Sequence, residues 1–115
     1  MLLDLSTIEI YVRPGHTDMR KAINGLTVMV QDYMYQNPLS GSLYLFCNRQ
    51  RRILKALYWD RNGFCLWQKR LEKHKFPWPM TQEDARQIST EQLSLLLKGI
   101  DFRHEHTALK YSHVS

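Results

Sequence analysis

The sequence predicts an α+β fold, in which a small, mostly antiparallel sheet of four or five strands packs against one long helix, with a short C-terminal helix. Three observations support this prediction. Residues 42–71 contain three β-rich runs joined by short polar turns, a pattern typical of a three-strand meander at the centre of a sheet. Residues 18–36 carry apolar side chains at helical spacing. Ser89 and Gln92 form a capping-box pattern that predicts the shorter helix.

The N-terminal part is expected to contain a strand followed by the long helix. The strand lies within residues 7–15 (TIEIYVRPG) and ends at Pro14, because proline has no N–H to donate to a sheet. Thr17 is the expected N-cap of the helix, and Asp18 would lie in its first turn, where the helix dipole favours negative charge. The apolar side chains then predict a helix over residues 18–36, ended by an Asn-Pro pair.

The central strands are SLYLFC, RILKALYW and FCLWQKRL. Asn62-Gly63 lies between the second and third runs and is a strong hairpin signal. KFPWP, at residues 75–79, is expected to be an edge strand stopped by its prolines. The short helix TEQLSLLLK follows, and Gly99 is expected to cap its C-terminus.

Side-chain alternation divides the meander into two faces, provided that both turns hold an even number of residues. The expected core face, which the long helix would cover, carries Leu43, Leu45, Cys47, Leu54, Ala56, Tyr58, Cys65, Trp67 and Leu71. The other face carries Tyr44, Phe46, Ile53, Lys55, Leu57, Trp59, Phe64, Leu66, Gln68 and Arg70. This second face mixes aromatic and basic residues, so it either forms a surface for nucleic acid or a second core layer beneath the C-terminal helix.

Positive charge is concentrated in one region of the chain. The net charge is +5, and residues 49–75 hold nine Lys or Arg against only Asp60 and Glu72. Such a local concentration predicts an anionic partner. The candidate DNA-binding residues are Arg49, Arg51, Arg52, Lys55, Arg61, Lys69, Arg70, Lys73 and Lys75. The candidates for stacking on bases, or for anchoring a protein interface, are Trp59, Phe64 and Trp78.

Several classes of protein are disfavoured. Residues 1–102 are expected to form one domain and residues 103–115 a flexible tail, with no apolar run near the roughly 20 residues that a membrane helix needs. The two cysteines, Cys47 and Cys65, have no metal-site spacing and predict a cytoplasmic protein with reduced thiols. The acidic residues show no spacing that would assemble a two-metal nuclease. The sequence therefore predicts a protein that is not an enzyme and needs neither a metal nor a cofactor.

Three blocks of sequence carry a resemblance to a known family: GHTDMRKAINGL, ILKALYWDRNGFCLWQKRLEKHKFPWP and QLSLLLKGIDF. Over residues 12–102 the chain resembles the accessory TnpB proteins encoded by the second reading frame of insertion sequence 66-type bacterial transposons. That family usually has Gly in place of Ala22, Asp in place of Asn24, and Gly near His74. The resemblance implies a role in transposition beside a separate DDE-type transposase, with no catalytic residues assigned to the accessory protein.

Two hypotheses about molecular function follow. In the first, the basic residues bind the backbone of transposon-end DNA, and the aromatic candidates stack on distorted or unpaired bases. In the second, the protein is an adaptor that docks on the transposase, or on another protein of the same element, without contacting DNA. The sequence leaves the oligomeric state open.

Overall fold

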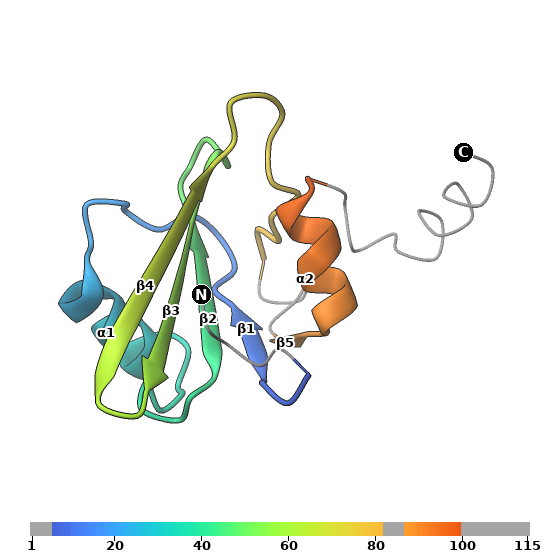
Figure 1. Ribbon diagram of the computed structural model, residues 1–115. Helices are drawn as coiled ribbons and strands as arrows, with labels where there is room; N and C mark the ends of the chain where they lie inside the picture. Colours follow the sequence, from blue (N-terminus) through green and yellow to red (C-terminus); the bar gives the residue numbers. More distant parts are fainter. Residues whose placement is uncertain (1–5, 82–86, 100–115) are drawn as a thin grey trace.

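The computed structural model describes residues 6–81 and 87–99. A five-stranded mixed sheet has the strand order β4-β3-β2-β1-β5. Its strands are β1 (Ile10–Val12), β2 (Leu43–Cys47), β3 (Ile53–Asp60), β4 (Gly63–Arg70) and β5 (Gln87–Ile88), and its helices are α1 (Ile23–Asp32) and α2 (Thr90–Leu97). The helices lie on opposite sides of the sheet (Figure 1). The α+β class is therefore confirmed. The predicted tail, residues 103–115, lies outside the described residues.

The predicted meander is confirmed. β2 pairs antiparallel with β3, and β3 pairs antiparallel with β4 along its whole length. Asp60 pairs with Gly63, so the two turn residues are Arg61 and Asn62, one position earlier than the Asn-Gly signal indicated. The sheet is not wholly antiparallel, because β1 runs parallel to β2 and α1 forms the crossover between them. β5, which the sequence pattern did not indicate, pairs antiparallel with β1.

The first helix is shorter than predicted, and its expected cap is wrong. α1 begins after Ala22, which makes no side-chain cap, and it ends at Asp32. Thr17 is buried and donates its backbone N–H to the Cys47 carbonyl oxygen (2.7 Å), and Asp18 accepts hydrogen bonds from Arg20. The Thr17 bond ties the segment before α1 to the end of β2. The Lys21 N–H donates to the Asp18 carbonyl oxygen (3.1 Å) and closes a turn, so a long-range hydrogen bond and a local turn replace the predicted helix there.

The two faces of the meander are assigned correctly, but the expected helix covers the wrong one. α1 packs its buried residues against Tyr44, Phe46 and Leu57, on the aromatic and basic face. Leu93 and Leu96 of α2 pack on the face that carries the expected core residues. Alternation cannot reveal this choice, because the hand of the β1–α1–β2 crossover decides which face α1 covers. The aromatic face is thus a second core layer beneath α1, and the C-terminal helix lies on the opposite face.

The predicted edge strand at residues 75–79 does not form. This segment instead buries Phe76 and Trp78 beside α2, in the core layer on that face of the sheet. The predicted start and end of α2 are confirmed. Ser89 and Gln92 make both hydrogen bonds of a capping box, and Gly99 follows the helix with φ +83°, a conformation that favours glycine.

A basic end of the sheet as candidate nucleic-acid interface

Three segments that are distant in sequence meet at one end of the sheet. The backbone N–H of Leu71, just after β4, donates to the Arg52 carbonyl oxygen (2.8 Å), and the N–H of Phe76 donates to the Arg51 carbonyl oxygen (2.7 Å). The Lys69 ammonium donates to the Leu97 carbonyl oxygen at the end of α2 (3.0 Å). The β2–β3 turn, the segment after β4 and the C-terminus of α2 are thereby held together.

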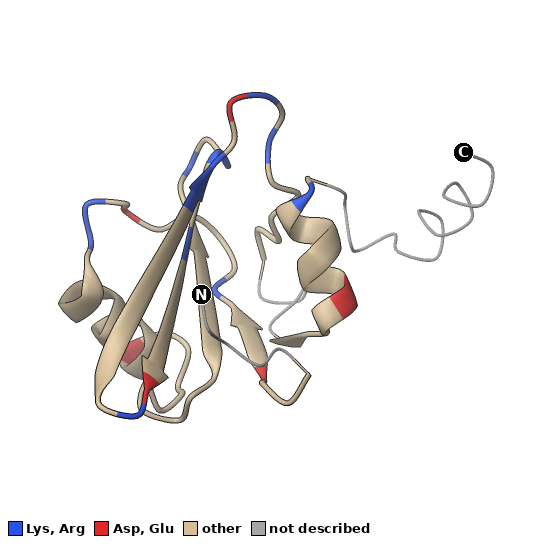
Figure 2. Ribbon diagram, viewed as in Figure 1, with Lys and Arg blue, Asp and Glu red and all other residues tan. Residues whose placement is uncertain are grey.

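Lys and Arg residues of all three segments lie at this end, where the ribbon in Figure 2 is blue. We call the resulting surface the basic end, and it comprises Arg49, Arg51, Arg52, Lys69, Arg70, Lys73, Lys75 and Lys98. Sequence reasoning missed Lys98, because nothing in the helical pattern indicated that α2 ends beside β4. Arg51 and Lys69 are half-buried, and the other six are exposed.

One acidic residue, Glu72, belongs to the described part of this end. Its carboxylate lies 2.9 Å from the Arg70 Nε, and both side chains are exposed. The Arg52 guanidinium also donates to the Glu72 main-chain oxygen (3.2 Å). An exposed ion pair is screened by solvent and contributes little free energy, so Arg70 remains able to exchange Glu72 for another anion.

Local hydrogen bonds order the loops of the basic end. The Asn48 side-chain oxygen accepts the backbone N–H groups of Arg52 (2.9 Å) and Ile53 (3.1 Å), which shapes the β2–β3 turn. Arg51 has φ +59° within this turn. In the second loop His74 has φ +68°, a conformation that favours glycine.

Lys55 lies outside this surface. It is 8% exposed beneath the segment that precedes α1, where its ammonium donates to the carbonyl oxygens of Met19 (2.8 Å) and Lys21 (2.9 Å). These bonds satisfy the buried ammonium group of Lys55 with two part-buried carbonyl oxygens. Lys55 is therefore a structural cation in this fold.

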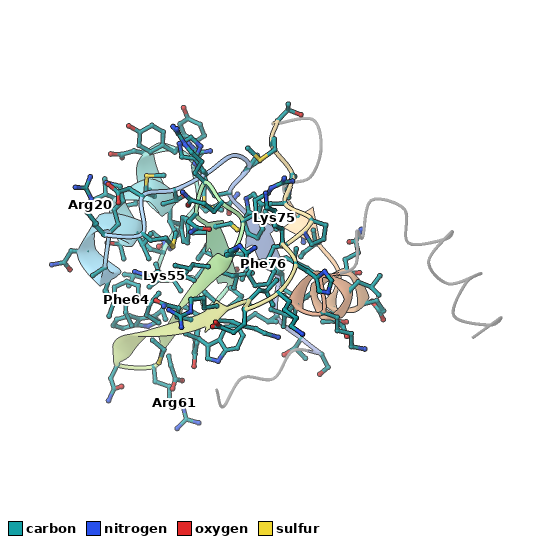
Figure 3. All side chains as sticks on the ribbon, turned by 90° about the horizontal axis from the view of Figure 1, so that it is seen from above. Arg20, Lys55, Arg61, Phe64, Lys75 and Phe76 are labelled. Carbon is teal, nitrogen blue, oxygen red and sulfur yellow. The ribbon has the colours of Figure 1, made fainter. Side chains whose placement is uncertain are left out.

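Arg61, Trp59 and Phe64 lie at the far end of the β3–β4 hairpin, apart from Lys75 and the rest of the basic end (Figure 3). Trp59 lies six positions along β3 from Ile53, which is about 20 Å at roughly 3.3 Å per residue. The Trp59 and Phe64 rings contact each other edge to face, with their centroids 4.9 Å apart. The structure therefore does not bring these two aromatic candidates together with the basic cluster.

Trp78 is not the exposed anchor that the sequence indicated. Its side chain is 1% exposed, and its indole N–H donates to the carbonyl oxygens of Arg13 and Gly15, each at 3.0 Å. The indole thus joins the segment after β4 to the chain after β1, which is a structural role.

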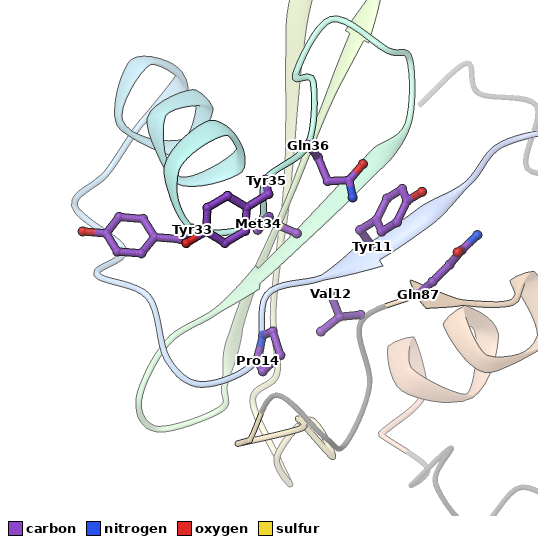
Figure 4. A pocket seen from close by; sticks show the side chains of 8 residues that line it. All are labelled: Tyr11, Val12, Pro14, Tyr33, Met34, Tyr35, Gln36 and Gln87. Atoms are coloured by element: carbon purple, nitrogen blue, oxygen red, sulfur yellow. The ribbon is translucent and has the colours of Figure 1, made fainter.

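A second surface feature, which the sequence did not reveal, is an aromatic pocket of about 480 Å³ beside β1 (Figure 4). It is lined by Tyr11, Val12, Pro14, Tyr33, Met34, Tyr35, Gln36 and Gln87. Tyr35 is 84% exposed with φ +55°, and the Arg13 guanidinium carbon lies 5.6 Å from the centroid of the Tyr33 ring. The sequence pattern predicts YMYQ, residues 33–36, as the end of a helix, so it gives no indication that these residues line a pocket.

The described residues 6–81 and 87–99 contain no group of three or more His, Cys, Asp or Glu side chains that could hold a metal ion. Burial raises the pKa of the Cys47 thiol to about 12, so this thiol is protonated at neutral pH. Neither described helix is long and apolar enough to cross a membrane.

The fold and its surface together define a small α+β protein with a cationic end suited to an anionic partner. Residues 8–107 match the family of IS66 Orf2-like proteins, and the chain belongs to this family, as its resemblance indicated. Membership implies an accessory role in the transposition of an insertion sequence, together with the transposase of the same element, and the family is not one of known enzymes.

Two curated relatives come from Sinorhizobium fredii. The chain is 41% identical to the uncharacterized protein y4hO over 104 residues, which is 90% of each chain. It is 33% identical to the uncharacterized protein y4jC over 95 residues, which is 83% of this chain and 81% of the relative. No solved structure matches the chain.

Proposed function

We propose that this accessory protein binds the DNA of its element through the basic end. The observation that carries the proposal is the convergence of the β2–β3 turn, the segment after β4 and the C-terminus of α2, which gathers eight cations around the single carboxylate of Glu72 among the described residues. Lys and Arg neutralise phosphates and release condensed counterions, which supplies affinity for DNA of any sequence.

The exposed cations of the basic end are the proposed phosphate contacts. They are Arg49, Arg52, Arg70, Lys73, Lys75 and Lys98. Arg51 and Lys69 contribute charge from half-buried positions, whereas Lys55 and Arg61 take no part. Because the aromatic candidates lie away from the basic end, binding rests on contacts with the phosphate backbone of DNA. Any preference for a DNA sequence must then come from DNA shape or from a few base-edge contacts.

The test is fluorescence anisotropy of the full chain with labelled transposon-end duplex, scrambled duplex and single-stranded DNA across a salt series. We expect affinity to fall steeply with salt. Lys73→Gln/Lys75→Gln removes two exposed cations of the basic end and should flatten the log–log salt slope by about 2, since each phosphate contact contributes about 0.9. The matched control, Lys21→Gln/Arg61→Gln, removes the same charge elsewhere and should change the slope much less.

Two results would contradict the proposal. One is the absence of binding to any of the three DNAs at low salt. The other is an equal loss of affinity in both double variants, which would mean that net charge matters and the basic end does not.

The aromatic pocket favours a second candidate function, in which the protein is an adaptor for the transposase. Tyr33, Tyr35 and Leu39 expose more than half of their surface near the end of α1, and exposed aromatic side chains often anchor protein interfaces. The adaptor hypothesis no longer rests on Trp78, which is buried, or on Trp59 and Phe64, which pack on each other.

Capture of purified transposase after nuclease treatment tests the adaptor function. We expect Tyr33→Ala/Tyr35→Ala to reduce capture and to leave DNA affinity unchanged. Val28→Ala alters an exposed apolar side chain on α1 that is not part of the pocket lining, and it is the control. Full capture by the double variant would exclude the pocket as the docking site.

A further inference from the structure

We propose that the free edge of β4 pairs with β4 of a second copy, so that two sheets join into one. In the described part of the chain, β4 is hydrogen-bonded to β3 alone and forms one edge of the sheet (Figure 1). It is eight residues long, whereas β5 at the opposite edge has two. The last two residues of β4, Lys69 and Arg70, also belong to the basic end, but this inference concerns the backbone edge of the whole strand and does not depend on DNA binding.

The pairing with β3 determines which backbone groups of β4 point outward. Asp60 and Gly63 flank a two-residue turn, and at the other end the Leu71 N–H donates to the Arg52 carbonyl oxygen. Hydrogen-bonded and non-hydrogen-bonded pairs alternate along an antiparallel ladder. The N–H and C=O groups that point away from β3 are therefore those of Phe64, Leu66, Gln68 and Arg70.

The edge lacks the features with which proteins usually prevent strands from joining. Such features are proline, a bulge, a very short strand or charges along the edge. β4 contains no proline, its register with β3 is continuous, and its two cations stand at its last two positions. Phe64, Cys65, Leu66 and Trp67 are half-buried, so both faces next to the edge carry apolar surface that a further strand would cover.

A second copy of β4 can pair with every outward N–H and C=O group of this edge, because the strand is self-complementary about a two-fold axis perpendicular to the sheet. With the axis at Trp67, Phe64 of one copy opposes Arg70 of the other, and Leu66 opposes Gln68. All four outward residues then exchange hydrogen bonds with the other copy. Equivalent faces of the two sheets also lie on the same side of the joined sheet.

Charge also favours this antiparallel register. It places Arg70 opposite Phe64 of the other copy and Lys69 opposite Cys65 of the other copy. No cation therefore lies directly opposite a cation of the partner strand. A register centred on Leu66 would leave Arg70 beyond the end of the partner strand. If the proposed function also holds, the dimer carries one basic end at each end of the joined sheet and can contact two DNA segments.

Light scattering of the full chain after size exclusion tests the proposal across a concentration series. We expect a mass approaching twice 13.7 kDa as concentration rises. Gln68→Pro removes an outward N–H from an edge strand, where proline is tolerated, so it should give a monomer with unchanged circular dichroism. Gln68→Ala keeps the N–H and should remain dimeric.

A crosslink tests the register independently of those variants. On the two-fold axis the two copies of residue 67 form a non-hydrogen-bonded pair with Cα atoms about 4.5 Å apart, which suits a disulfide. Trp67→Cys with Cys65→Ser should therefore form a symmetric intermolecular disulfide under mild oxidation, and Cys65→Ser alone should not. A wild-type chain that stays monomeric at high micromolar concentration would overturn the proposal, as would a folded Gln68→Pro variant that remains dimeric.

Discussion

The ammonium group of Lys69 on β4 donates a 3.0 Å hydrogen bond to the main-chain oxygen of Leu97, the last residue of α2. A cation at this position meets the negative end of the helix dipole and one of the last carbonyl groups of α2, which have no partner within the helix itself. The same contact fixes α2 beside the segment after β4. Lys69 therefore holds the basic end together, in addition to contributing positive charge to it.

We expect Lys69→Met to lower the free energy of unfolding by about 1 kcal/mol, because it removes a charged donor from a helix C-terminus. Urea denaturation of the variant and the wild type measures the difference. Lys73→Met is the control, since Lys73 is exposed in the neighbouring loop, and it should change stability by less than about 0.5 kcal/mol. Equal stability of all three proteins would show that the bond to Leu97 contributes nothing.

Lys55→Met is expected to lower the free energy of unfolding by about 2 to 3 kcal/mol, because the variant leaves the part-buried carbonyl oxygens of Met19 and Lys21 without their charged donor. Thermal and urea unfolding check the stability. DNA affinity of the folded variant should equal that of the wild type, since Lys55 is buried. A loss of affinity as large as that of Lys73→Gln/Lys75→Gln would contradict the structural role.

Trp78→Phe keeps most of the apolar volume and removes the N–H that serves Arg13 and Gly15. The expected loss is about 1 to 3 kcal/mol, because two part-buried carbonyl groups lose their donor. The comparison is Trp59→Phe, a half-buried position whose edge-to-face contact with Phe64 a phenyl ring can preserve. Chemical denaturation should show the larger loss for Trp78, and the reverse order would refute the proposed role of its indole.

The hydroxyl of Tyr11 donates a 2.6 Å hydrogen bond to the Glu9 carboxylate, and this bond, with a smaller effect of burial, raises the pKa of Tyr11 from 10.0 to about 12. The folded state thus binds the phenolic proton more tightly than the unfolded state does. The resulting stabilisation is complete below pH 10 and is lost as the pH rises from about 10 to 12.

Absorbance titration of tyrosinate tests this assignment. Burial also raises the pKa of Tyr58, so Tyr11 is one of at least two late phenols. We expect the amplitude of the late transition to fall by one tyrosine in Tyr11→Phe, and the same amplitude to move to lower pH in Glu9→Gln. The stability of Tyr11→Phe should also fall less between pH 10 and 12 than that of the wild type. A titration curve that Glu9→Gln leaves unchanged would count against the hydrogen bond as the main cause.

Features encoded within a few neighbouring residues were predictable. The capping box of Ser89 and Gln92 depends on a four-residue pattern, and the meander on alternation along each strand. The N-cap at Thr17 was wrong because its backbone N–H bonds to Cys47, which lies 30 positions away in the sequence. No local pattern contains that information.

Part of the candidate site was predictable from the sequence, and part depended on contacts between distant residues. The charge density of residues 49–75 was visible in the sequence, and seven of the nine candidate cations belong to the basic end: Arg49, Arg51, Arg52, Lys69, Arg70, Lys73 and Lys75. Lys98 could not be predicted as a member, and Lys55 could not be predicted as buried. Both depend on where a helix or its preceding segment lies against the sheet.

The sequence by itself determined the strands of the meander, the two faces of their side chains, the boundaries of α2 and the family of the protein, because each is encoded by short patterns or by their order along the chain. Only the tertiary structure decided that α1 covers the aromatic face and that, among the described strands, β4 lies at an edge of the sheet. The physical reason is that a parallel crossover and contacts between distant residues set these features, and local periodicity is the same whichever face a helix covers.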